Sequence, residues 1–174
     1  MAERVYDPRR RAPMTEYGLV VHRHLVRYSA DVEGPAGPFC RIEGRLTLRG
    51  PDFVVRDAAG REALTVGRPR AFLTREVHRV LRDGAVEARV LLPAFSFARE
   101  YSVEVREGPP WRVRQDWATD QYAFERDGVP LALVSGRVLR RGLLRAEEYR
   151  IVDVEDAEDP LLVVTLAAIL TRSM

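Results

Sequence analysis

The C-terminal segment constrains the fold of this chain more than any other part of its sequence. Residues 161–170 read LLVVTLAAIL and contain a single polar residue, Thr165. Asp159 and Pro160 precede this run and predict a helix start, because Asp caps free amide groups and Pro is tolerated in the first turn. A helix that is apolar on every face must be surrounded by protein. Thr165 can hydrogen-bond to a carbonyl of its own helix.

The same segment is too short to cross a membrane. A helix rises about 1.5 Å per residue, so residues 161–170 span about 15 Å, roughly half of a ~30 Å hydrocarbon layer. The N-terminus reads MAERVYDPRR, which is polar and interrupted by proline, so it lacks the apolar core of a signal peptide. We therefore expect a cytoplasmic protein.

The middle of the chain has the pattern of an antiparallel sheet. From Tyr17 onward, short runs rich in Val, Leu, Phe and Tyr alternate with polar residues, and turns separate them at intervals too short for crossover helices. A strand, a turn and a returning strand recur around four glycines: Gly60, Gly84, Gly108 and Gly128. Glycine supplies the positive φ that tight hairpin turns require, so we assign these glycines a structural role.

A sheet with this many strands needs closure, because exposed edges promote aggregation. The runs number about ten to twelve if each is counted once, which fits a closed barrel that is wide enough to hold something inside. In residues 101–105 the apolar side chains share one face and the polar side chains share the other, so one face is buried. We predict a mainly β fold in which the C-terminal helix fills the barrel and the arginines mostly occupy the wet face.

Composition excludes several function classes. All 28 basic residues are arginine, and with 26 acidic residues interleaved among them the net charge is only +2. No strong overall field therefore favours nucleic acid, and chemistry that depends on lysine is impossible. A codon bias toward arginine explains the missing lysine more simply than phosphate recognition does. The lone cysteine, Cys40, has no partner for an internal disulfide, and we expect it to be a small buried apolar residue.

We expect two regions along the chain. Residues 1–14 form a flexible basic arm, in which Arg9, Arg10 and Arg11 lie between Pro8 and Pro13 with almost nothing to bury. Residues 15–174 form a single barrel domain.

No motif commits the chain to a reaction or a metal. GxSxG, P-loop and GxGxxG patterns are missing from the sequence, and the candidate serines have no adjacent base: Ser96, Ser102 and Ser135. His22 and His24 fall on one side of a predicted strand, but neither His78 nor Cys40 has the spacing to complete a zinc site with them. The acidic stretch 153–159 lacks the central glycine of a calcium loop and fits a solvated turn. We predict no enzyme activity, no cofactor and no metal.

Two clusters of arginine are the candidate ligand-binding residues. The first comprises Arg137, Arg140, Arg141 and Arg145, around Gly142, Leu143 and Leu144, and the second comprises Arg68, Arg70 and Arg75, around Phe72 and Leu73. A basic loop with an apolar tip suits an anionic membrane surface, where each basic group contributes about 1 kcal/mol. The alternative is that the apolar residues continue buried strands while the arginines are solvated. Trp111 and Trp117 either form a stacking platform or pack in the core.

Four features of the sequence resemble the LURP-one-related family, which belongs with the tubby C-terminal domain and the phospholipid scramblases. They are GRLTLRGPDFVVRDAAGREALTV, YAFERDGVPLALVSGRV, EEYRIVDVEDAEDP and the apolar C-terminal helix, and the match runs from about Tyr17 to Leu170. The resemblance implies a closed antiparallel barrel of about twelve strands around a hydrophobic C-terminal helix. In that superfamily, tubby domains bind phosphoinositides and scramblases are linked to lipid movement and calcium.

These observations leave three functional hypotheses. The first is a non-enzymatic domain, peripheral to the membrane, that binds anionic lipid headgroups through Arg137, Arg140, Arg141, Arg145, Arg68 and Arg70. The second is a structural or adaptor protein that docks another protein through its barrel wall and basic arm. The third is nucleic-acid binding through residues 9–11 and the aromatic residues, which predicts a steep dependence on salt and which the near-neutral net charge disfavours. The oligomeric state stays open.

Overall fold

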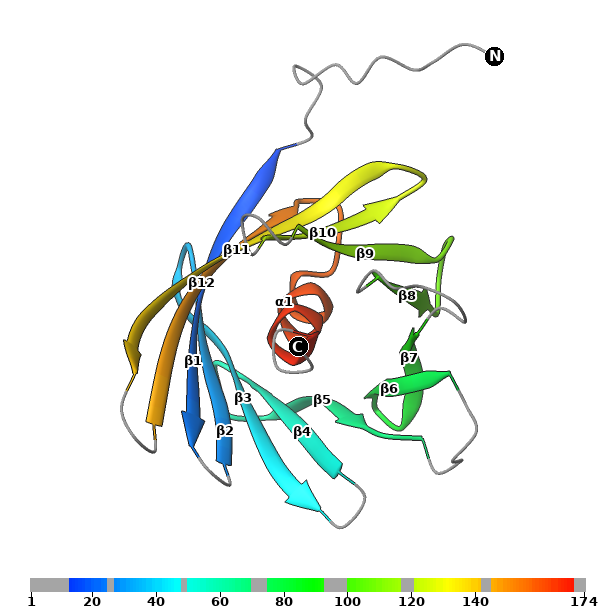
Figure 1. Cartoon of the computed structure of the whole chain (residues 1–174). Helices are drawn as coiled ribbons and strands as arrows, with labels where there is room; N and C mark the ends of the chain where they lie inside the picture. Colours follow the sequence, from blue (N-terminus) through cyan, green and yellow to red (C-terminus); the bar gives the residue numbers. More distant parts are fainter. Residues whose placement is uncertain are drawn as a thin grey trace.

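The computed structural model describes residues 13–24, 27–47, 50–69, 75–92, 100–116, 121–141 and 145–170. These residues form a closed antiparallel β-barrel around one helix (Figure 1). The strands are β1 (Met14–His24), β2 (Arg27–Gly34), β3 (Gly37–Thr47), β4 (Gly50–Asp57), β5 (Glu62–Gly67), β6 (Glu76–Arg82), β7 (Ala85–Leu91), β8 (Glu100–Val105), β9 (Trp111–Asp116), β10 (Gln121–Arg126), β11 (Val129–Arg141) and β12 (Arg145–Glu155). The helix is α1 (Pro160–Leu170). The predicted fold class is confirmed.

The barrel closes between its first and last strands. β1 pairs with both β2 and β12, and its register with β12 extends from Met14 opposite Glu155 to His24 opposite Arg145. All other strands pair with their neighbours in chain order, and every pairing is antiparallel. Closure gives each described strand two partners, which removes the exposed edges that the sequence argument identified as a hazard.

Consecutive strands run in opposite directions, so the barrel has two distinct ends. At the turn end, short hairpin turns join each even-numbered strand up to β10 to the strand after it. Asp83 (φ 51°) and Gly84 (φ 78°) form one of these turns, and Asp127 (φ 52°) and Gly128 (φ 79°) form another. Gly60 and Gly108 also have positive φ, which confirms the structural role predicted for the turn glycines.

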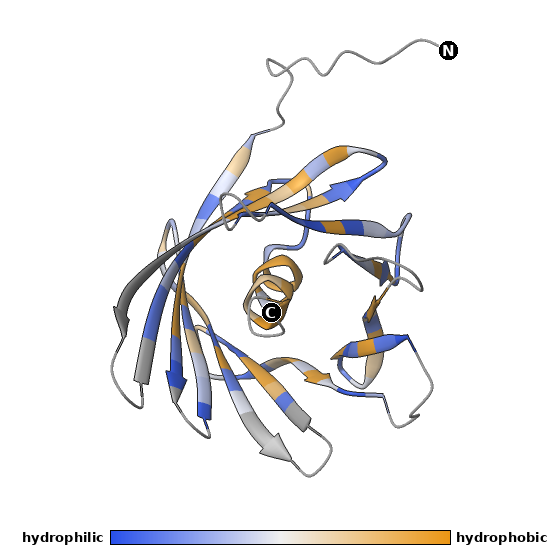
Figure 2. Ribbon diagram, in the orientation of Figure 1, coloured by the Kyte–Doolittle hydropathy of each residue, from blue (hydrophilic) through white to orange (hydrophobic). Residues whose placement is uncertain are grey.

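Alternation along each strand places apolar side chains inside the barrel. Leu19, Val21 and Ile42 are fully buried, and the ribbon in Figure 2 alternates between hydrophobic and hydrophilic colours along the strands. Cys40 belongs to this core, as predicted. Burial raises the pKa of its thiol to about 12, with a smaller contribution from the charge of Asp31, so the residue is an unreactive core side chain.

The C-terminal helix lies inside the ring of strands (Figure 1) and is hydrophobic along its length (Figure 2). Residues 162–170 are all buried, and the helix lies closest to β1, β3 and β12. Asp159 caps its start as predicted, because Asp159 Oδ1 accepts hydrogen bonds from the backbone amides of Leu161 at 3.0 Å and Leu162 at 3.4 Å. Among the described helices, none is long and apolar enough to span a membrane.

Of two hydroxyl groups inside the barrel, one forms a hydrogen bond with a described residue and the other does not. Tyr28 on β2 donates its hydroxyl proton to the carbonyl of Ala168 at 2.6 Å and so holds the last turn of α1. Thr165 was expected to hydrogen-bond to its own helix, and this expectation is wrong. Its Oγ1 is buried with no hydrogen-bond partner among the described residues.

The barrel begins slightly earlier than the predicted domain boundary. Met14 is already in β1, and the carbonyl of Pro13 accepts a hydrogen bond from the amide of Asp156 at 3.1 Å. The rest of the predicted arm, including Arg9, Arg10 and Arg11, lies outside the described residues.

Candidate anion-binding end of the barrel

The first arginine cluster is brought together by one pair of strands. Its members are Arg137, Arg140 and Arg141 on β11 and Arg145 on β12. Arg140 lies opposite Glu147 and Arg141 lies opposite Ala146, so the cluster occupies the part of the β11–β12 pair farthest from the turn end. The side chains of these arginines, together with residues 142–144, lie outside the described part of the chain. Their backbone positions support one basic region on two adjacent strands.

The second cluster lies on the opposite wall of the barrel. Arg68 directly follows β5 and Arg75 directly precedes β6, and both are exposed. Arg70, Phe72 and Leu73 lie outside the described residues. In the closed strand order, β5 is six strands from β11 in either direction. The two clusters therefore share an end of the barrel without merging into one patch.

A further exposed arginine at this end was missed by the sequence analysis. Arg27 starts β2, in the run LVRYSA, where nothing in the local pattern distinguishes it from an ordinary wall residue. Arg27, Arg68 and Arg75 form no ion pair with any residue that the structure describes. We call this end, defined by Arg27, Arg68, Arg75, Arg141 and Arg145, the arginine end.

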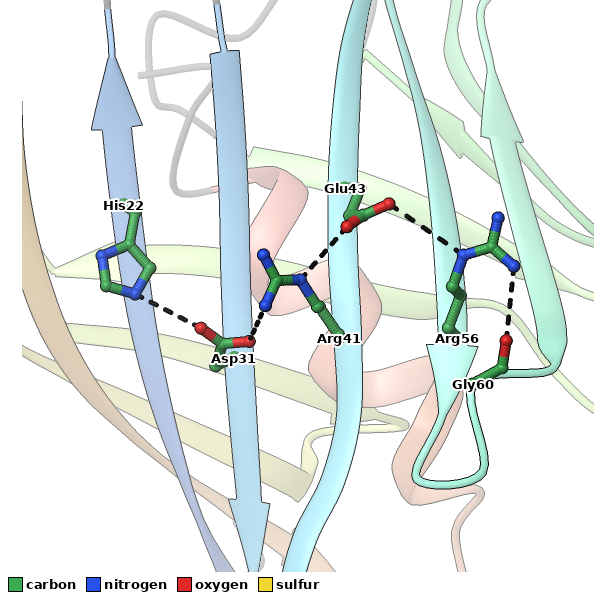
Figure 3. A network of polar contacts seen from close by, with 6 residues as sticks. All are labelled: His22, Asp31, Arg41, Glu43, Arg56 and Gly60. Carbon is green, nitrogen blue, oxygen red and sulfur yellow. Dashed lines mark hydrogen bonds and ion pairs between the residues drawn. The ribbon is translucent and has the colours of Figure 1, made fainter.

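On the outer wall formed by β1 to β4, charged side chains form ion pairs with one another. A chain of contacts crosses β1 to β4 (Figure 3): His22 to Asp31 at 3.3 Å, Asp31 to Arg41 at 3.4 Å, Arg41 to Glu43 at 3.1 Å and Glu43 to Arg56 at 4.0 Å. Arg56 also donates to the carbonyl of Gly60 at 3.3 Å. Exposed pairs of this kind contribute about 0–1 kcal/mol each. This network pairs the charged side chains on the part of the wall formed by β1 to β4.

Of the histidines considered for metal binding, His22 is part of this wall. His22 lies between Asp31 and Glu147, with His22 Nδ1 at 3.4 Å from Glu147 Oε1. The side chain of His24 lies outside the described residues, and His78 is buried inside the barrel. Within the described ranges, no three metal-ligating side chains come together.

Among the described residues, four arginines are in phase with the buried residues of their strands, as exceptions to the expectation that arginines mostly occupy the wet face. They are Arg23, Arg82, Arg126 and Arg150. Arg150 is 3% exposed, forms an ion pair with Glu148 and lies 5.4 Å from the centre of the Tyr122 ring. Arg23 binds the same carboxylate at 3.0 Å. The signal was available, because Arg150 is in phase with the buried Val152 and Val154 on β12.

The other two inward arginines anchor the start of the helix at the turn end. Arg82 on β6 forms an ion pair with Asp159, and Arg126 on β10 binds Glu158 at 2.9 Å. The acidic stretch before α1 is therefore an ion-paired element of the fold as well as a turn. Near it, burial raises the pKa of Tyr17, and the negative charges of Asp156 and Asp159 raise it further.

The aromatic residues proposed as a stacking platform do not form one where they are described. Trp111 is 3% exposed and packs edge-on against Phe124, with ring centres 6.5 Å apart, so its alternative role in the core is confirmed. Trp117 lies outside the described residues.

A hollow of about 400 Å³ opens on the outer wall over β8, β9 and β10, near the turn end. Its lining includes the hydroxyl of Ser102 and the charged residues Arg112, Glu125 and Asp127, with neither His nor Cys. Glu125 accepts a hydrogen bond from Arg114 at 2.8 Å, which engages a carboxylate that would otherwise be a candidate base. This set does not resemble a nucleophile beside an activating base.

Comparison with protein families agrees with this architecture. A family model for LURP-one-related proteins matches residues 33–171, from β2 to the end of the helix. Because the match covers most of the sequence, the chain belongs to the LURP-one-related family. No match was found among curated proteins or among solved structures.

Proposed function

We propose that this protein is a non-enzymatic binding domain that attaches to anionic lipid headgroups at a membrane surface. The observation that carries the proposal is the arrangement of Arg137, Arg140, Arg141 and Arg145 on two adjacent strands at one end of a closed barrel. Four arginine positions on neighbouring strands favour a phosphate ligand, since arginine binds phosphate through planar, bidentate hydrogen bonds. Membership of the LURP-one-related family is consistent with this proposal.

The charge distribution supports a surface ligand in preference to a buried one. Inside the barrel, Arg23 and Arg150 share the carboxylate of Glu148, while Arg82 and Arg126 bind Asp159 and Glu158. These interior charges hold the fold together and are already paired. A ligand of opposite charge is therefore attracted to the outer end of the barrel, and the protein would act in the cytoplasm at the periphery of a membrane.

Flotation of the full chain with liposomes tests the proposal. We expect the protein to float with vesicles of phosphatidylcholine that contain anionic phosphatidylserine or a phosphoinositide, and to remain in solution with phosphatidylcholine alone. Flotation weakens as salt rises, because the Debye length falls from about 10 Å at 0.1 M to about 3 Å at 1 M. Failure to float with either anionic lipid at low salt would overturn the proposal.

Replacement of the four arginines by glutamine tests the site itself. The quadruple variant R137Q/R140Q/R141Q/R145Q should lose most of its flotation, and a variant of the paired wall residues Arg41 and Arg56 should retain it. The adaptor hypothesis makes a different prediction, namely capture of a protein partner that is lost when residues 1–14 are deleted. Capture of that kind without flotation would replace the lipid proposal.

A further inference from the structure

Arginines lie at several positions around the circumference of one end of the barrel. Arg27 starts β2, Arg68 follows β5 and Arg75 precedes β6, while Arg141 ends β11 and Arg145 starts β12. In an antiparallel meander the ends of odd-numbered strands and the starts of even-numbered strands lie together, so all five positions share the arginine end. The strand order places β2, β5 and β6 on different sides of the ring from β11. Basic positions therefore surround the barrel axis.

The turn end has the opposite character. Its turns carry the acidic residues Asp57, Asp83, Glu107, Asp127 and Asp156, most of them exposed, and also the exposed arginines Arg61, which pairs with Asp57, and Arg106. Arg82 and Arg126 at this end are engaged by Asp159 and Glu158. A negatively charged surface attracts the arginine end and repels the turn end, which gives the molecule a preferred orientation along its axis.

We propose that the barrel docks end-on, with the arginine end against an anionic bilayer and the turn end facing the solvent. This inference rests on the proposed function and adds a docking surface that joins the two predicted clusters with Arg27, which belongs to neither. The occupant is a flat anionic surface and not a single headgroup in a pocket, because the arginines are distributed around a rim. Arg27, Arg68 and Arg75 form no ion pair with a described residue, so their charges are available to lipid phosphates.

A matched pair of triple variants tests the orientation. The test variant is R27Q/R68Q/R75Q, and the control is R89Q/R106Q/R112Q. The control residues are also exposed arginines without an ion pair to a described residue, but they lie on the wall and at the turn end. Both variants change the net charge by the same amount. Melting curves followed by circular dichroism should show that both fold like the unmodified protein.

Partitioning onto vesicles of phosphatidylcholine with 30% phosphatidylserine (about one anionic lipid in three) provides the readout. We expect the partition coefficient of R27Q/R68Q/R75Q to fall roughly a hundredfold, because three basic groups leave the lipid surface. The partition coefficient of the control should fall much less, since Arg106 and Arg112 lie at the turn end, where the ~10 Å Debye length at 0.1 M salt screens them from the lipid, and only Arg89 lies nearer the arginine end. The dependence of binding on salt should flatten in the test variant alone.

Each other outcome has a separate meaning. If the unmodified protein does not bind these vesicles at low salt, the proposed function fails and the end-on mode fails with it. If it binds and both triple variants weaken equally, lipid binding stands but end-on docking is wrong. If the β11–β12 quadruple variant abolishes binding while R27Q/R68Q/R75Q retains it, the protein docks through one wall.

Discussion

The two ends of the barrel differ in how their arginines are paired, with exposed Arg106 as an exception at the turn end. At the turn end, Arg82 and Arg126 reach inward to the acidic residues before α1 and fix the helix in place. At the arginine end, Arg27, Arg68 and Arg75 are exposed and have no ion-pair partner within the described chain. These arginines differ in whether an acidic side chain lies close enough to form an ion pair. Arginines whose charge is matched locally stabilise the fold, and unmatched arginines are available to a ligand.

Turn chemistry explains why the acids gather at one end. Tight hairpin turns favour Asp and Gly, and the pairs Asp83–Gly84 and Asp127–Gly128 adopt the positive φ angles that these turns require. The start of a helix also favours negative charge, which Asp159 supplies. Both demands fall at the turn end, because β12 leads into α1 there. The acidic character of that end is therefore a consequence of how the chain turns.

Removal of the helix is expected to have the largest effect on this two-ended structure. Deleting residues 159–174 removes the filling of the barrel and leaves a cavity far larger than those that already cost several kcal/mol. We expect an insoluble or molten product, with loss of near-ultraviolet circular dichroism and gain of dye binding to exposed apolar surface. Deleting only residues 171–174 is the control and should leave a folded protein. A cooperative melting transition in the longer deletion would contradict the role of the helix as core.

Asp159 tests how firmly the turn end holds the helix. Asp159→Ala removes both the cap on Leu161 and the ion pair with Arg82, and we expect the free energy of unfolding to fall by about 1–2 kcal/mol. Asp159→Asn keeps a capping side chain and loses the charge, so it should recover most of that loss. Urea denaturation at neutral pH measures both variants. Equal losses in the two variants would mean that the ion pair, and not the cap, dominates.

Tyr28 tests the other end of the same helix. Tyr28→Phe removes the hydrogen bond to the carbonyl of Ala168 while keeping the ring, so we expect a loss of about 1 kcal/mol. The Tyr28 ring also packs edge-on against Phe53, and this contact should survive the change. Urea denaturation compares the two variants. If Tyr28→Phe lowers the free energy of unfolding more than Asp159→Ala does, the helix is held mainly at the arginine end and not at the turn end.

Ionisation of Cys40 makes the stability of the protein depend on pH in the alkaline range and has no effect at neutral pH. The thiol has its pKa raised from an ordinary 9.0 to about 12 by burial, so the unfolded chain ionises first as pH rises. The protonated thiol therefore contributes its full share to the free energy of unfolding below pH 9, and this contribution is lost between pH 9 and 12. At pH 10 the loss is about 1 kcal/mol. Melting at pH 7 and pH 10 should show a larger loss for the unmodified protein than for Cys40→Ala. Identical losses would show that the thiol does not titrate on unfolding.

The sequence alone predicted most of the fold. Recurrent glycine turns, alternation along the strands and the apolar run 161–170 led to a closed barrel with an axial helix, as the structure has it. The cap at Asp159 and the burial of Cys40 were also predicted correctly. These features are local or follow a simple periodicity, and both kinds can be recognised in the sequence alone.

The candidate site was less predictable, because it depends on which strands become neighbours. The sequence placed Arg68 and Arg137 in two clusters, and only the strand order put those clusters on opposite walls of one end. Arg27 has no local signal and joins the arginine end through the antiparallel meander. Arg150 carries a signal in its phase with Val152, which the general preference of arginine for solvent concealed.

What the sequence by itself determined is that this chain must surround an apolar helix with strands, since no other arrangement hides that helix from water. The tertiary structure decided which arginines are neutralised and which remain available. Pairing of inward arginines with Glu148, Glu158 and Asp159 depends on residues that are distant in sequence and meet only when the barrel closes. Electrostatic interactions weaken over about 10 Å in salt, so the use of each charge is set by its neighbours in space.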